Sequence, residues 1–101
     1  MNILDNIDIP LQDENFKTLL EHKNIKIIRI VSSDNVELIE YIQDEDEWIL
    51  LLEGKAIIIL ELKEIKLSKG DTLFIPAKTK HKITYTQNGT VWLAIHISSN
   101  L

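Results

Sequence analysis

Cysteine is absent from this chain of 101 residues, so it can contain no disulfide framework, thiolate metal site or cysteine nucleophile. Long hydrophobic runs are missing too, and apolar stretches such as 48–52 are far too short to span a membrane. Basic residues are fewer than acidic ones: the chain has 11 Lys and Arg and 16 Asp and Glu, which gives a net charge of −5. This negative charge argues against nucleic acid as the main partner. The N-terminus lacks the basic region of a signal peptide, so a cytoplasmic location is expected.

The residues that are abundant favour β-structure. Isoleucine, valine and threonine are frequent, and these β-branched side chains suit strands. Short apolar segments alternate with turn clusters roughly every eight to twelve residues, which is typical of a sandwich, jelly roll or barrel. The predicted strands are 25–31, 36–43, 47–52, 55–62, 65–67, 72–75, 80–86 and 91–97.

One short helix is predicted before the strands. Asp13 can cap it, and Phe16, Leu19 and Leu20 recur at helical spacing before His22 at its C-terminal end. No linker or low-complexity tract divides the chain. We therefore expect one domain over 1–101, with a helical segment in 1–23 and a β-barrel in 24–98.

Several predicted strands are apolar on both faces, notably 57–60 and 91–93. A small barrel fills its inside with side chains and normally leaves a polar outside. Apolar residues on both faces indicate that the outside is covered as well, by another strand layer, the N-terminal helix or a second subunit. The sequence therefore predicts a homodimer.

Two turn-anchored segments carry a more specific signal. In the first, six residues separate Glu47 from Gly54; in the second, five residues separate Gly70 from Pro76, and His81 follows five positions after the proline. This spacing resembles the two motifs of the cupin superfamily, and the resemblance extends from about residue 24 to 97. The sequence looks especially like small bacterial cupins of unassigned function. The resemblance implies an antiparallel double-stranded β-helix, the jelly-roll barrel.

The motif positions also suggest where a site would lie. The family's paired histidines fall on Tyr41 and Gln43, and its closing asparagine falls on Tyr85. In an extended segment Tyr41, Gln43 and Glu47 share a face, and the resemblance places that face inside the barrel with His81. The candidate metal ligands are therefore Gln43, Glu47 and His81, and the candidate ligand-binding residues are Tyr41, Gln43 and Tyr85.

His96 is a further candidate metal ligand whose direction the sequence leaves open. It shares a strand face with Trp92 and Ala94, and if that face is internal it joins the other three candidates. If Leu93 and Ile95 are internal instead, His96 points away. Periodicity does not decide, because both faces are apolar.

Two functions fit these residues. The first is a cupin that binds a small molecule and a divalent transition metal (iron, manganese, nickel or zinc), with Glu47 and His81 as the nucleus of the metal site. The second is a metal-free module that binds or senses a small ligand without catalysis. The replacement of both first-motif histidines by Tyr41 and Gln43 favours the second, and whether the protein is an enzyme stays open. A purely structural barrel without a cavity is a third alternative.

Overall fold

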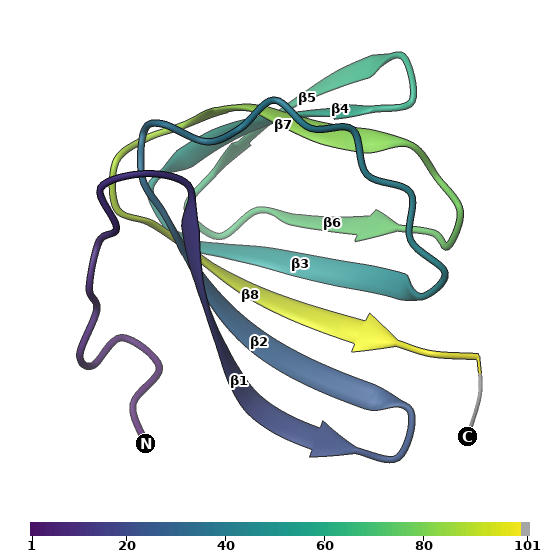
Figure 1. Ribbon diagram of the computed structural model, residues 1–101, viewed down its shortest axis with the longest axis horizontal. Helices are drawn as coiled ribbons and strands as arrows, with labels where there is room; N and C mark the ends of the chain where they lie inside the picture. Colours follow the sequence, from purple (N-terminus) through teal and green to yellow (C-terminus); the bar gives the residue numbers. More distant parts are fainter. Residues whose placement is uncertain (100–101) are drawn as a thin grey trace.

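The computed structural model describes residues 1–99, which form eight antiparallel strands in two facing sheets (Figure 1). One sheet has five strands in the order β1-β2-β8-β3-β6, and the other has three in the order β5-β4-β7. This architecture confirms the predicted all-β jelly-roll barrel. The strands are β1 (Glu14–His22), β2 (Ile25–Ser32), β3 (Asp46–Glu53), β4 (Lys55–Leu60), β5 (Lys63–Ser68), β6 (Thr72–Ile75), β7 (His81–Thr86) and β8 (Thr90–Ile97).

The register of the central strands decides which side chains enter the barrel. In the β3–β8 pair Glu47 lies opposite His96, Ile49 opposite Ala94, and Leu51 opposite Trp92. Cross-strand partners project to the same face of a sheet, so these residues point between the two sheets together. The apolar members of this set are buried and form the core with side chains of the small sheet, among them Ala56, Ile58 and Leu67.

The predicted N-terminal helix is wrong. Glu14–His22 is the edge strand β1, which pairs with β2 and is joined to it by a turn in which Lys23 has a φ of 52°. Leu19 is an extra residue in this ladder, because Thr18 lies opposite Ile28 while Leu20 lies opposite Ile27. Such a bulge reverses the faces of the strand. The apolar spacing therefore looks helical although the backbone is extended, and no helix occurs in residues 1–99.

The strand predicted over 36–43 is also wrong. This segment crosses from one sheet to the other and forms only an isolated bridge, in which Tyr41 N donates to the His81 carbonyl (2.7 Å) and His81 N donates to the Tyr41 carbonyl (3.0 Å). Alternating residues gave it a strand-like pattern, yet Leu38 and Ile42 are exposed. Its consequence for the site is that Tyr41 is fixed beside His81.

The segment before β1 is tied to the outer face of the large sheet by Arg29. This buried side chain donates to the carbonyls of Ile3 (3.1 Å), Asp5 (2.8 Å) and Asn6 (3.4 Å). A guanidinium needs several acceptors when it is buried, and here backbone carbonyls supply them to both terminal nitrogens, while Nε has no partner among the described residues. Within the described residues, no helix is long and apolar enough to cross a membrane.

Candidate functional site

A cavity of about 150 Å³ lies between the sheets. Its wall is largely isoleucine, from both sheets, and its polar groups come from β1, β3, β7, β8 and the segment 36–43. Six isoleucines (Ile28, Ile30, Ile49, Ile58, Ile75 and Ile83) share the lining with Phe16, Trp92 and the polar residues Glu14, Tyr41, Gln43, Glu47, His81 and His96. An apolar cavity with a few converging polar groups is the usual form of a small-molecule site.

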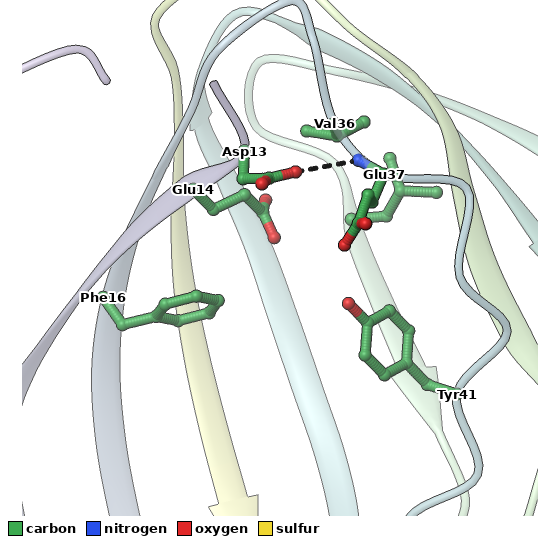
Figure 2. Close-up of a pocket in the computed structure, with 7 residues that line it drawn as sticks. Asp13, Glu14, Phe16, Val36, Glu37 and Tyr41 are labelled. Carbon is green, nitrogen blue, oxygen red and sulfur yellow. Dashed lines mark hydrogen bonds between the residues drawn. The ribbon is translucent and has the colours of Figure 1, made fainter. Parts of the chain in front are cut away.

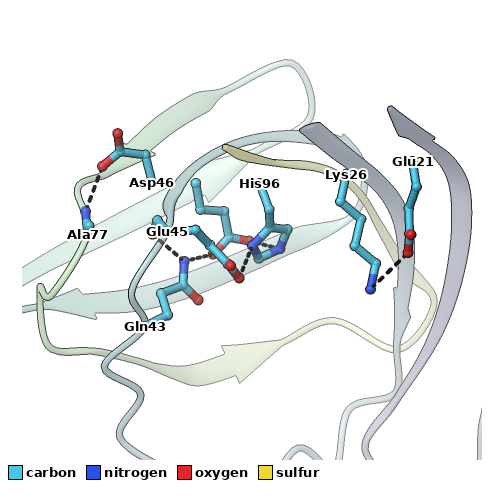
Figure 3. A network of polar contacts seen from close by, with 8 residues as sticks. Glu21, Lys26, Gln43, Glu45, Asp46, Ala77 and His96 are labelled. Atoms are coloured by element: carbon cyan, nitrogen blue, oxygen red, sulfur yellow. Dashed lines mark hydrogen bonds and ion pairs between the residues drawn. The ribbon is translucent and has the colours of Figure 1, made fainter. Parts of the chain in front are cut away.

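Glu47 contacts both Gln43 and His96, and Figure 3 shows these two residues and Glu45 close together in one polar network. Glu47 Oε1 accepts a hydrogen bond from Gln43 Nε2 at 3.0 Å, and Glu47 Oε2 lies 3.5 Å from His96 Nε2. On the other side of the imidazole, His96 Nδ1 lies 3.1 Å from Glu45 Oε1, within ion-pair distance but without hydrogen-bond geometry. His96 thus points inward and stands between two carboxylates, one lining the cavity and one half-exposed. This arrangement settles the direction that the sequence left open.

His81 presents one defined ring nitrogen to the cavity. Its side chain is buried, and Nδ1 lies 3.0 Å from the carbonyl oxygen of Thr79. A carbonyl can only accept, so Nδ1 carries the proton, and in the neutral ring Nε2 is an acceptor. Among the described residues Nε2 has no hydrogen-bond partner. The Tyr41 ring lies beside it, with the ring centroids 5.9 Å apart.

A second cavity, of about 200 Å³, opens next to the first and shares Glu14, Phe16, Tyr41 and Ile83 with it (Figure 2). The remaining lining residues are Asp13, Val36 and Glu37. The two spaces therefore adjoin through their shared residues, and the second one is called the mouth below. Figure 2 shows carboxylates of the mouth and the Tyr41 hydroxyl turned toward the same space.

The charge around the mouth shifts two titrating groups. Burial raises the pKa of the Glu14 carboxyl, and the nearby negative charges of Asp13 and Glu47 add to this, although the hydrogen bond from Ser32 opposes it. Burial also raises the pKa of Tyr41, followed by the charges of Glu14 and Glu37. Both effects follow from a concave, acidic surface with no positive side chain in its lining.

Five of the predicted site residues line the inner cavity: Tyr41, Gln43, Glu47, His81 and His96. Tyr85 does not: it lies on β7, exposed and beyond a register shift in the β4–β7 pairing.

Sequence reasoning missed Glu14 and Phe16, since both fell in the segment read as a helix. The signal that could have found them is the period-two alternation of Glu14, Phe16 and Thr18, which puts all three on one face of a strand.

The four predicted metal ligands do not form a complete set. Within residues 1–99 no group of three or more His, Cys, Asp or Glu side chains lies close enough to share an ion. Gln43 turns its amide nitrogen toward Glu47, and both ring nitrogens of His96 face carboxylates. That leaves Glu47 and His81, fewer than the three protein ligands that catalytic zinc sites take. The residues present therefore do not fit a resident transition metal, and the predicted metal binding is not confirmed.

Comparison with known proteins decides the family. The family model described as Cupin domain matches residues 37–96, more than half of the chain. The chain belongs to the cupin family. Its jelly-roll barrel and the placement of the motif residues 47 and 81 inside that barrel agree with this membership.

Solved structures resemble this cupin over nearly its whole length. A candidate mannose-6-phosphate isomerase from Ralstonia eutropha JMP134 is 32% identical, with a TM-score of 0.88, covering 98% of this chain and 97% of that one. A cupin superfamily protein from Desulfitobacterium hafniense DCB-2 is 22% identical, with a TM-score of 0.82 and coverage of 92% and 84%. An uncharacterized protein from Methanocaldococcus jannaschii is 42% identical over 38 residues, a match that spans 38% of this chain and 30% of that protein.

Proposed function

We propose that this cupin binds a small organic molecule directly in the barrel, without a resident metal. The observation that carries the proposal is the inner cavity, in which Glu47 and His81 present polar atoms to a largely isoleucine wall. A protein cavity of about 150 Å³ holds a molecule the size of benzene. With the adjoining mouth, the site suits a ligand somewhat larger than a single ring.

The donor set supports binding rather than metal chemistry. His96 is engaged by two carboxylates, and the Gln43 amide nitrogen is engaged by Glu47, so neither side chain is free to turn toward an ion without losing its partner. The alternative function is the metal-dependent cupin enzyme that the sequence also allowed, with Glu47 and His81 as the first two ligands. It predicts tightly held metal in the purified protein.

The description of the Ralstonia protein raises a second candidate, isomerisation of a phosphorylated sugar. A phosphate dianion is normally bound by Arg, Lys or backbone N–H groups. Neither an arginine nor a lysine lines the inner cavity or the mouth of this cupin. The chemistry of the site therefore disfavours a sugar phosphate, despite the similarity of the two chains.

A thermal-shift screen combined with elemental analysis tests the proposal. The protein is purified without a metal-affinity tag, beside a Glu47→Ala, His81→Ala double variant and a matched exterior control, Glu64→Ala with His22→Ala, both exposed. We expect small molecules that raise the melting temperature of the parent and the control but not of the site variant, and metal well below one equivalent. Stoichiometric transition metal that is lost only in the site variant would establish the metalloenzyme instead. A cavity that no small molecule stabilises would refute binding altogether.

The predicted homodimer is retained as part of the proposal. Outward-facing apolar side chains form one row across all five strands of the large sheet, where register places Leu20 beside Ile27, then Ile95, Trp48 and Phe74. Phe74 and Leu20 are about half exposed. Light scattering should report a dimer that Phe74→Glu converts to monomers, and a monomeric parent would refute it. A cytoplasmic location likewise stays a prediction.

A further inference from the structure

We infer that the ligand of this site is an organic cation, a protonated amine carried on a small apolar body. The inference rests on the proposed function and specifies its ligand class. Three features lead to it: the charge of the lining, the free acceptor atoms of Gln43, Glu47 and His81, and the aromatic side chains around the cavities.

The lining carries a net negative charge as long as the carboxyl groups of Asp13, Glu37 and Glu47 are ionised. Carboxyl groups of Asp13, Glu14, Glu37 and Glu47 line the two adjoining spaces, against two histidines and no lysine or arginine. Even with both imidazoles protonated and Glu14 neutral, the negative charges exceed the positive ones. A carboxylate or phosphate ligand would therefore meet repulsion, whereas a cation would gain attraction that is strengthened by the partly dry surroundings.

Three polar groups of the inner cavity leave acceptor atoms free, whereas the Tyr41 hydroxyl can donate or accept. Gln43 Nε2 points to Glu47 Oε1 (3.0 Å) and to the carbonyl of Glu45 (3.5 Å), so its amide hydrogens are engaged and its oxygen remains. His81 is more than nine-tenths buried, and in its neutral form its unpartnered Nε2 accepts. With the Glu47 carboxylate, these groups need a ligand that donates. An ammonium group supplies three N–H donors and no acceptor.

Glu14 is held at the mouth by a chain of buried hydrogen bonds. Trp92 Nε1 donates to Ser32 Oγ at 2.9 Å, and because the indole can only donate, the Ser32 hydroxyl turns its own hydrogen to Glu14 Oε2. Ser32 and Trp92 are fully or almost fully buried. This chain fixes the carboxylate on the edge strand, facing both cavities, instead of letting it swing into solvent.

Aromatic rings complete the surroundings of a cation. Phe16 and Tyr41 reach toward the same space from opposite sides of the mouth, and Trp92 lines the inner cavity (Figure 2). Aromatic faces attract ammonium groups, and they pack well on an apolar ligand body. The isoleucine wall below them, with room for about one ring, accepts that body.

Isothermal titration with three matched probes tests the inference: benzylamine, benzyl alcohol and benzoate, which share one ring and differ in charge. Near neutral pH we expect benzylamine to bind at least about tenfold more tightly than benzyl alcohol, as a charge-assisted hydrogen bond allows, and benzoate not to bind. Added salt should weaken the amine and leave the alcohol unchanged. Glu14→Gln and Glu47→Gln should each lower the affinity for benzylamine by about tenfold, while Glu64→Gln, exposed on β5, should have no effect.

The outcomes distinguish a failure of the cation inference from a failure of small-molecule binding itself. If benzyl alcohol or benzoate binds as tightly as benzylamine, the cation inference is overturned while small-molecule binding stands. If none of the three probes binds and the thermal-shift screen also finds no ligand, both the cation inference and the proposed small-molecule binding are refuted. The salt dependence is measured on the unaltered protein, so the result does not depend on whether either glutamine variant folds.

Discussion

Removing the Ser32 hydroxyl should lower the free energy of unfolding by more than the loss of one small polar group normally does, because this hydroxyl makes two hydrogen bonds. Ser32 Oγ accepts from Trp92 Nε1 and donates to the Glu14 carboxylate, and Ser32 itself is fully buried. In Ser32→Ala the indole N–H is left unsatisfied in the core, at a cost of about 1–3 kcal/mol, and a charge-assisted hydrogen bond worth about 1.5–3 kcal/mol is lost. Water can reach Glu14 from the mouth and offsets part of the second amount. We therefore expect the free energy of unfolding to fall by about 2–4 kcal/mol.

Urea denaturation followed by far-ultraviolet circular dichroism measures this change, and the melting temperature should fall by roughly 10 to 20 °C in a domain of this size. Ser68→Ala, at an exposed position, is the control and should change little. Trp92→Phe removes the donor but keeps most of the ring, so the double-mutant cycle with Ser32→Ala should show a coupling of about 1 kcal/mol or more. A loss below about 0.5 kcal/mol, or strictly additive effects, would refute the hydrogen-bonded chain.

Two further predictions concern charge and backbone. Burial raises the pKa of Glu14, so the folded state binds its proton more tightly than the unfolded chain; the free energy of unfolding should fall as pH rises from the usual glutamate range through the raised pKa. Glu14→Gln should remove that fall in urea denaturation at a series of pH values, and an unchanged profile would contradict the assignment. Gly54 (φ 97°) would place an alanine Cβ 2.9 Å from Thr90 Cα, whereas Gly70 (φ 91°) has open space. Gly54→Ala should therefore lower the free energy of unfolding by at least about 2 kcal/mol more than Gly70→Ala, and equal losses would show that only the backbone angle matters.

The positions of turns and strands could be predicted from the sequence where the turn residues and the apolar segments agree. Gly54 and Gly70 both have positive φ at the ends of turns, as their motif positions imply, and the central strands follow their apolar segments closely. Local reasoning failed at Glu14–His22 because the extra residue Leu19 interrupts the alternation. An isolated helix of this length is marginal in water, and pairing along β2 gives the segment a full hydrogen-bonded ladder instead.

The site was predictable only as far as the motifs reach. Glu47 and His81 come from the two motif segments, and the structure brings both to one cavity. The direction of His96 needed the β3–β8 register, which sequence periodicity could not supply because both faces of β8 are apolar. Glu14 depends on a contact with Ser32 across a hairpin, and no local pattern encodes such a contact.

The position of β1 at the edge of the large sheet has a consequence for ligand exchange. This strand is hydrogen-bonded on one side only, carries a bulge, and holds Glu14 and Phe16 over the mouth. Edge elements open locally at a lower free energy than the whole domain unfolds. Fraying of β1 would carry two of the lining side chains away together, so the same motion that admits a ligand also dismantles part of its site. A bound ligand would therefore slow amide hydrogen exchange along β1 ahead of any other strand, and its residence time would follow the opening rate of that single edge.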